Sequence, residues 1–298
     1  MNYADWLAFA ETQLTGNKKT DPFINPKVDA SLLLQFVTGC SRSFTLAFSE
    51  TLLSPQELAQ LEKLLQRRIN GEPMAYILGE QPFWSLNLKV STDTLIPRAD
   101  TECLVENALD CIHRRITCKT FTGHLDILDL GTGTGAIALA LAQELRSMSK
   151  NLFSFSVIGI DLVDNAVSLA KENATYNKIE NVNFLQSHWF SSLKGKNFDL
   201  IVSNPPYIDE KDPHLQLGGV RFEPLSALVA REQGYADLHY IIVNALNYLK
   251  PKGWILLEHG WTQGEKVRSF FDVNFWHNIQ TLVDYNQNER VTLAQLKS

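Results

Sequence analysis

The stretch Asp129-Leu130-Gly131-Thr132-Gly133-Thr134-Gly135 decides the fold of this chain. An apolar run at 125–130 precedes it and an apolar helical run at 134–145 follows it, so the glycines join a strand to a helix. Glycines permit the tight turn and let a ligand lie against the backbone. By itself this turn leaves three possibilities open: a dinucleotide, a phosphate, or a tight loop without a ligand.

Outward from this turn, apolar strands and helices alternate along the chain. Such alternation predicts an α/β fold, a mostly parallel sheet with helices on both faces. We expect strands at 125–130, 155–160, 182–185, 199–202, 254–258, 280–285 and 290–294, and helices at 134–145, 164–176, 236–249 and 262–271.

The region before this alternation has a different pattern. Apolar residues recur at helical spacing through 3–71, and Ser54-Pro55 followed by Glu57 is typical of a helix start with Ser54 as N-cap. This region reads as a small helical domain without a site of its own. Between it and the sheet, 76–90 is expected to form a short strand pair.

Composition limits the class of protein. With 298 residues, 45% hydrophobic, the chain can form one large domain or a medium and a small one. No apolar run approaches the roughly 18–20 residues that span a bilayer, and 1–20 lacks the basic start of a secretory signal. We therefore expect a cytoplasmic protein that binds no membrane, with four free thiols at Cys40, Cys103, Cys111 and Cys118.

Charge and ligand spacing limit the partners. The net charge is −6, with no obvious basic stripe, which argues against direct binding of nucleic acid. No Cys/His cluster has the spacing of a metal site, so we expect no metal.

A second acid points to a nucleotide-type ligand. Asp161 ends the next strand, where a carboxylate can accept both hydroxyls of a ribose. A dinucleotide enzyme would use the same acid, and Asp161 could instead cap the helix expected from Asp164. The GxGxG spacing after Asp129 is not the GxGxxG of dinucleotide folds, and it resembles motif I of class I methyltransferases. That resemblance implies S-adenosyl-L-methionine as the cofactor.

The sequence Asn204-Pro205-Pro206-Tyr207, placed after the apolar strand that ends at Val202, indicates the chemistry. Two prolines make the turn stiff, and it lies beyond the carboxyl end of a strand, where α/β sheets bind ligands. The Asn204 side-chain oxygen and the Pro205 carbonyl can each accept one N–H of a planar amide, while Tyr207 stacks on its plane. These residues therefore predict methyl transfer to an amide-type nitrogen that is held in position.

The chain as a whole resembles the bacterial protein-glutamine N5-methyltransferases that modify class-1 peptide chain release factors. The resemblance implies a seven-stranded methyltransferase domain (93–298), a helical N-terminal domain (1–73) and a β-hairpin linker (74–92). It is carried by the stretches 71–79, 83–84, 95–98, 100–102, 129–142, 202–210, 221–224, 257–260 and 289–291.

The resemblance also assigns site residues. It implies that the glutamine of a release factor's Gly-Gly-Gln loop is methylated, with S-adenosyl-L-homocysteine as product. We separately expect the protein to be a monomer. Ala99 and His188 depart from the family pattern; His188 stands where an aspartate near the adenine amino group is expected, so that contact does not carry over. The implied cofactor residues are Asp129, Gly131, Thr132, Gly133, Thr134, Gly135, Asp161, Trp189 and Asn204, the implied substrate residues are Asn204, Pro205, Pro206 and Tyr207, and the catalytic ones are Asn204, Pro205 and Tyr207.

Three other functions fit parts of the pattern. Enzymes that methylate adenine or guanine amino groups also use Asn/Asp-Pro-Pro-Tyr/Phe, but they need access to an unstacked base, and the acidic balance argues against this. A glutamine methyltransferase for a ribosomal protein is closer, although 129–135 fits the release-factor branch better. A non-enzymatic cofactor sensor would not need Asn204 and the two prolines. The segment 209–231, with Arg221, Phe222 and Glu223, is expected to contact the protein substrate.

Overall fold

The computed structural model describes residues 1–16, 24–117, 121, 123–150 and 152–298. Contacts divide the chain into two units: Met1–Glu80 with Pro213–Glu223, and Gln81–Asp212 with Pro224–Ser298. The boundaries 1–73, 74–92 and 93–298 stay a prediction. Cys118 lies outside the described residues, while Cys40, Cys103 and Cys111 are free thiols.

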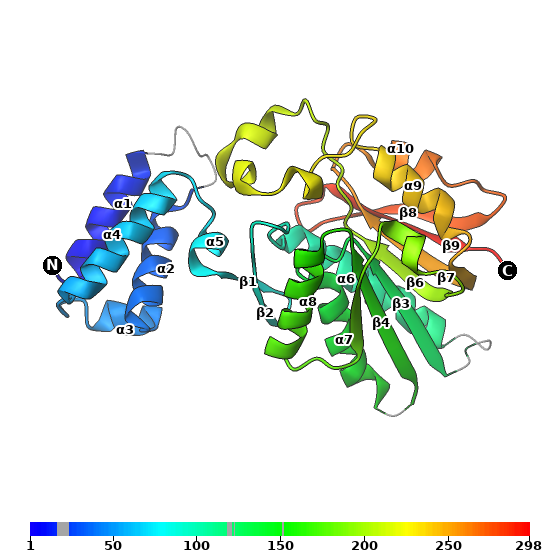
Figure 1. Ribbon diagram of the computed structural model, residues 1–298, viewed down its shortest axis with the longest axis horizontal. Helices are drawn as coiled ribbons and strands as arrows, with labels where there is room; N and C mark the ends of the chain where they lie inside the picture. Colours follow the sequence, from blue (N-terminus) through cyan, green and yellow to red (C-terminus); the bar gives the residue numbers. More distant parts are fainter. Residues whose placement is uncertain (17–23, 118–120, 122, 151) are drawn as a thin grey trace. The chain divides into compact units, whose positions relative to one another are not determined.

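The first unit is helical (Figure 1). A capping box begins its longest helix: Ser54 Oγ accepts the Glu57 N–H at 3.2 Å, and the Glu57 carboxylate accepts the Ser54 N–H at 2.7 Å. Gly39 ends an earlier helix in the left-handed conformation. The elements are α1 (Tyr3–Thr15), α2 (Pro26–Thr38), α3 (Arg42–Ala47), α4 (Pro55–Ile69) and α5 (Met74–Leu78), with 3-10 segments η4 (Pro213–Gln216) and η5 (Gly218–Phe222).

The predicted strand pair at 76–90 begins too early. Pro73 precedes α5 and Gly79 ends it with φ 80°, so the first residues of that range are helical. The hairpin itself consists of β1 (Glu80–Phe83) and β2 (Leu86–Lys89). Its buried side chains, Phe83, Leu86 and Leu88, belong to the core of the second unit.

The second unit is built on a seven-stranded sheet in the described residues, with strand order β5-β4-β3-β6-β7-β9-β8. The pairings from β5 to β7 are parallel, and β9 is antiparallel to both β7 and β8, which confirms the predicted fold class. The strands are β3 (His124–Leu130), β4 (Ser154–Asp161), β5 (Val182–Gln186), β6 (Phe198–Ser203), β7 (Leu249–Glu258), β8 (Trp276–Val283) and β9 (Glu289–Leu296).

Helices cover both faces of this sheet because its strands are apolar on both faces. Ile127 packs with α6, α7 and α8, whereas the next residue, Leu128, packs with α9 and α10 on the other face. The helices are α6 (Glu102–Ile116), α7 (Ala136–Ser149), α8 (Asp164–Tyr176), α9 (Ala236–Ala245) and α10 (Gly264–Ser269), with 3-10 segments η2 (Ala99–Thr101), η3 (Trp189–Ser192) and η6 (Leu225–Ala227).

Several predicted boundaries in this unit are wrong by a few residues. The helix expected over 236–249 ends at Ala245, and β7 begins at Leu249 rather than at Trp254. The reason is pairing: Leu249 already pairs with Phe198 of β6, and the register then shifts before Trp254 pairs with Leu200. The spacing of apolar residues alone does not reveal such an irregular start of a strand. The last helix is likewise shorter than 262–271, and the strand expected at 280–285 is β8, 276–283.

Candidate functional site

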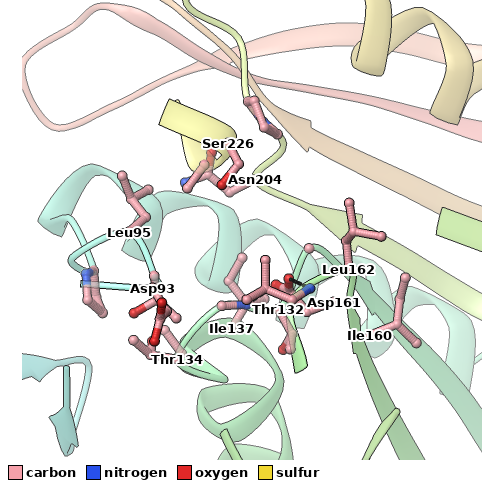
Figure 2. A pocket seen from close by; sticks show the side chains of 18 of the residues that line it. Asp93, Leu95, Thr132, Thr134, Ile137, Ile160, Asp161, Leu162, Asn204 and Ser226 are labelled. Carbon is pink, nitrogen blue, oxygen red and sulfur yellow. Dashed lines mark hydrogen bonds between the residues drawn. The ribbon is translucent and has the colours of Figure 1, made fainter. Parts of the chain in front are cut away.

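A cavity opens in the second unit at the carboxyl ends of four neighbouring parallel strands. Its lining includes the residues that directly follow β3, β4, β5 and β6. The cavity volume is about 220 Å³, and since one water needs roughly 10–15 Å³, it has room for an organic ligand. In Figure 2, Asn204 and Ser226 lie on one side of this cavity, and Thr132, Thr134 and Asp161 lie on the other.

The glycine turn after β3 is shaped by left-handed backbone. Gly131, Gly133 and Gly135 have φ of 71°, 54° and 84°, values that residues other than glycine rarely adopt. The turn is tied to β4, because Thr132 N–H donates to the Ile160 carbonyl at 2.8 Å. Gly131, Thr132, Gly133 and Thr134 line the cavity, whereas Gly135 begins α7 instead.

Asp129 does not line the cavity and is fully buried beneath the turn. Its Oδ2 accepts the Thr132 hydroxyl at 2.6 Å and the Ala138 N–H at 3.2 Å, while Oδ1 has no partner among the described residues. Burial raises the pKa of Asp129 to about 7, and these hydrogen bonds oppose the rise. Asp129 therefore shapes the turn from behind, and a direct contact with cofactor stays a prediction.

Asp161 lines the cavity at the end of β4. Its Oδ2 accepts the Gly133 N–H at 2.9 Å and its Oδ1 accepts the Val163 N–H at 3.0 Å, just before α8. Burial raises the pKa of this carboxyl, and the backbone hydrogen bonds oppose the rise. The carboxylate thus lines the cavity and also supports the start of α8, and each oxygen keeps a lone pair for a hydroxyl.

Trp189 lines the cavity in a strained backbone conformation, with φ 47°. The Ser187 hydroxyl holds it by donating to the Trp189 carbonyl at 2.7 Å. The indole ring lies close to Gly131, from whose ideal Cβ position it would be 3.7 Å away. The ring is therefore placed as a flat apolar wall beside the glycine turn.

Asp237, on α9, is a cavity residue that sequence reasoning missed. Burial raises the pKa of its carboxyl, and the charges of Arg231 and His188 together with a hydrogen bond from Trp189 oppose this. The carboxylate of Asp237 thus lies near His188. The family pattern predicted an aspartate at position 188 itself. The only sequence signal of Asp237 was an acid in the first turn of a helix. Other cavity residues outside the prediction include Thr94, Leu95, Pro97, Arg98, Thr101, Ser226 and Ala227.

The backbone of the Asn-Pro-Pro-Tyr turn is fixed at several points. Ser203 Oγ donates to the Leu130 carbonyl at 2.6 Å, joining the turn to the end of β3. The Gln263 side chain donates to the Tyr207 carbonyl at 3.0 Å and accepts the Gly260 N–H at 2.8 Å. Gly234 leaves no space beside that carbonyl, because a Cβ there would lie 2.1 Å from the Tyr207 oxygen.

The side chains of this turn are held as well. Asn204 Nδ2 donates to Thr101 Oγ1 at 3.1 Å, and the Tyr207 hydroxyl donates to Glu258 Oε1 at 3.2 Å. Burial raises the pKa of Tyr207 far above its usual range. Asn204 and Pro206 line the cavity, whereas Pro205 and Tyr207 do not, so the predicted stacking of Tyr207 on an amide stays a prediction.

Two absences concern the described residues alone. In them, no group of three or more His, Cys, Asp or Glu side chains is arranged to hold a metal ion. None of their helices combines the length and apolar character that crossing a bilayer requires.

The sheet order, the glycine turn and the Asn-Pro-Pro-Tyr turn define a class I methyltransferase. A methyltransferase-domain family model matches residues 121–294, and a model of the PrmC N-terminal domain matches residues 5–79. Full-length relatives narrow this class: the chain belongs to the release factor glutamine methyltransferase family. It is 59% identical to the enzyme of that name from Pasteurella multocida and 55% identical to that from Haemophilus influenzae, each time over 99% of both chains.

A third relative of the same name, from Escherichia coli, is 50% identical over 99% of both chains. Among solved structures, the catalytic domain of hMettl16 in complex with the MAT2A 3'UTR hairpin 1 superposes with a TM-score of 0.54. It is 11% identical, over 89% of this chain and 91% of that chain, so this likeness shows the fold alone.

Proposed function

We propose that this chain methylates the side-chain amide nitrogen, N5, of the glutamine in the Gly-Gly-Gln motif of class-1 release factors. The observation that carries the proposal is identity of 50–59% over 99% of the chain to enzymes named release factor glutamine methyltransferase. The site supports the proposal, because Asn204, whose side-chain oxygen can accept an amide N–H, lines the same cavity as the glycine turn.

The proposed cofactor is S-adenosyl-L-methionine, which leaves as S-adenosyl-L-homocysteine. The cavity residues fit it: Asp161 retains lone pairs for two ribose hydroxyls, Trp189 offers a flat face, and Gly131 and Gly133 leave backbone open to a ligand. When bound, this cofactor supplies a methyl group on a sulfonium, which is electrophilic without a metal. We therefore propose that no metal takes part.

The role proposed for the chain is to position the amide. The Asn204 side-chain oxygen and the Pro205 carbonyl accept one N–H each, which turns the face of the nitrogen toward the methyl donor. These acceptors also stabilise the positive charge that develops on nitrogen. The amide nitrogen gains a methyl group and then loses a proton to solvent, because a protonated amide is strongly acidic. Tyr207 and the two prolines keep the acceptors in place.

The test is methyl transfer from labelled S-adenosyl-L-methionine to a purified class-1 release factor. We expect label on the wild-type factor and none on a factor whose Gly-Gly-Gln glutamine is replaced by alanine, with mass spectrometry locating the methyl group on that residue. Label that persists on the alanine variant would contradict the proposal.

A second candidate is methylation of a base amino group, since the same turn suits adenine. The net charge of −6 disfavours a nucleic-acid substrate. Incubation with DNA or RNA alone is the control, and label there would favour this candidate. We also propose that the enzyme is a cytoplasmic monomer; light scattering during size-exclusion chromatography tests the oligomeric state.

A further inference from the structure

Glu258 is a buried carboxylate that the predicted site did not include. It ends β7, it is 1% exposed, and its Oε1 accepts the Tyr207 hydroxyl at 3.2 Å. Its Oε2 has no hydrogen-bond partner at normal distance among the described residues. A buried carboxylate oxygen without a donor is costly, so a nearby donor is expected to serve it.

Thr101 lines the cavity and carries a hydroxyl that can donate. It is 5% exposed, and its Oγ1 accepts Asn204 Nδ2 at 3.1 Å. A hydroxyl that accepts one hydrogen bond still has its own proton to donate. Burial raises the pKa of Glu258 to about 7, and hydrogen bonding from Thr101 opposes that rise. Thr101 thus accepts a hydrogen bond from the amide of Asn204 and also lowers the pKa of the Glu258 carboxyl.

Two neighbouring charges act on Glu258 in opposite directions. The guanidinium of Arg290 lowers the pKa of Glu258, while the carboxylate of Asp100 raises it. Arg290 itself is held by Asp284 at 3.1 Å and by Asp100 at 3.2 Å. Above pH about 7 Glu258 is ionised, and an ionised carboxylate only accepts hydrogen bonds, so every group that faces it must donate.

We propose that Glu258 is a positioning residue that sets the direction of the hydrogen bonds from Tyr207 and, through Thr101, from Asn204. The carboxylate obliges the Thr101 hydroxyl to donate toward it, so Thr101 Oγ1 must accept from the Asn204 NH2 group. The Asn204 side-chain oxygen is then left facing the substrate. Turned the other way, Asn204 would present its own N–H groups to the N–H groups of the amide and repel it.

This inference rests on the proposed function, because it assumes that the methylated group is an amide with two N–H donors. Glu258→Gln is the direct test. It keeps the shape of the side chain but adds an NH2 group that can donate to Thr101, so the direction of these hydrogen bonds is no longer fixed. We expect kcat to fall by about 10- to 100-fold, the cost of a misplaced reacting group. The KM for S-adenosyl-L-methionine and the calorimetric Kd for S-adenosyl-L-homocysteine should stay within about threefold, since no cofactor contact is removed.

The relay through Thr101 is tested separately. Thr101→Val removes the hydroxyl and should lose kcat to a similar degree, while Thr101→Ser keeps it and should retain most of the wild-type rate. Both changes break the same series of hydrogen bonds. The kcat of Glu258→Gln combined with Thr101→Val should therefore be at most about threefold lower than that of the worse single variant. Losses that multiply in the double variant would overturn the relay.

Thr292→Val is the matched control for stability. Thr292 is fully buried in β9, and its hydroxyl is hydrogen-bonded at 2.8 Å to Nε2 of His259, the residue that follows Glu258. This variant should lower the melting temperature without the loss of kcat. If Glu258→Gln keeps the wild-type kcat, or loses rate only as Thr292→Val does, Glu258 has a structural role alone. If Glu258→Gln does not fold, the Thr101 pair decides the proposal.

Wild-type labelling separates this inference from the proposed function. If the wild-type enzyme labels no release factor, the proposed function fails, whatever the variants do. If it labels the Gly-Gly-Gln glutamine and the variants behave as the wild type, only the role of Glu258 fails.

Discussion

Asn204 shows how much a single residue depends on its neighbours. Its place after a strand and before two prolines is read from sequence, but its side chain has a defined direction only because Thr101 lies beside it, 3.1 Å from Nδ2. Asp161 behaves in the same way: two backbone N–H groups hold its carboxylate at the cavity. Both functional side chains are thus fixed before a ligand arrives, which is the condition for catalysis by positioning.

At this scale we predict that Asn204→Ala loses turnover far more than cofactor affinity. The change removes the acceptor that aims the amide, so kcat should fall by about 100-fold or more. The Kd for S-adenosyl-L-homocysteine, measured by calorimetry, should change by less than about fivefold, because other cavity residues remain. Asn244→Ala is the control and should leave both unchanged, because Asn244 is a half-buried asparagine on α9 that bonds to the Tyr240 carbonyl and does not line the cavity. Near-normal turnover of Asn204→Ala would refute its assigned role.

Buried acids give a second prediction at this scale, on stability against pH. Burial raises the pKa of both Asp129 and Glu258 to about 7, well above the unfolded values near 4. Between those values the folded state holds protons that the unfolded state has released. Their contribution to stability is therefore fully present below pH about 4 and is lost as pH rises toward 7, by up to about 1.4 kcal/mol per pH unit and group.

Urea unfolding at pH 5, 6 and 7 measures this slope. Asp129→Asn and Glu258→Gln should each make the free energy of unfolding decline less steeply with pH than it does in the wild type. Glu57→Gln is the control: hydrogen bonds from Ser54 lower the pKa of Glu57, so its contribution is lost only as pH falls below this window. Wild-type slopes in both buried-acid variants would mean that these carboxyls are not perturbed in the folded protein.

At the scale of elements, turns are as decisive as strands. The Asn-Pro-Pro-Tyr turn is held by Gln263, which precedes α10, and by Ser203 and Glu258 at the ends of β6 and β7. Gly234, with φ 88°, lies closely against the Tyr207 carbonyl. We predict that Gly234→Ala costs several kcal/mol of stability or displaces the turn, because the new Cβ would meet the Tyr207 carbonyl oxygen.

Gly195→Ala is the matched control for that variant. Gly195 has a similar φ of 79° but nothing within 4 Å of its ideal Cβ position, so only backbone strain is added. Its cost should be about 1 kcal/mol, with kcat unchanged. Thermal unfolding and turnover of both variants separate the strain from the collision, and equal behaviour of the two would rule out the collision.

The capping box of α4 is testable in the same way. Ser54→Ala should cost about 1 kcal/mol of stability, since the Glu57 N–H loses the hydroxyl that accepts from it and the Glu57 carboxylate loses the hydroxyl that donates to it. Ser43→Ala, at an exposed position within α3, should cost only a few tenths. The comparison uses urea unfolding monitored by the circular dichroism signal of the helices at about 222 nm. Equal midpoints for the two variants would show that the box contributes nothing.

At the scale of the whole molecule, the two units differ in how local they are. The sheet unit needs strands from 124 to 296, so its site forms only when distant segments have met. The helical unit recruits a distant piece as well: Arg221 donates to the Asn70 carbonyl at 2.5 Å, although 151 residues separate them in sequence. The segment 209–231 was expected to be a recognition loop; part of it packs on the helical unit, and its contact with a release factor remains a prediction.

Sequence alone determined the parts whose cause is local. Alternating apolar segments predicted the sheet and its helices, and glycines predicted the turn after β3. Asn204–Tyr207 led to the proposed chemistry, which stays a prediction. Local patterns record periodicity and permitted backbone angles, which is why α8 was predicted at 164–176 with correct ends. They were least reliable where pairing decides the boundary, as at the start of β7.

Only the tertiary structure decided which side chains face the cavity and which hold the others. Asp129 and Tyr207 belong to the sequence motifs, yet they lie behind the site. Thr101 and Glu258 lie in stretches that carried the family resemblance but were assigned no role, and Asp237 lies in none of those stretches. The physical reason is that hydrogen-bond partners such as Asn204 and Thr101 lie 103 residues apart. No periodicity or spacing encodes such a meeting; the order of strands in the sheet brings it about.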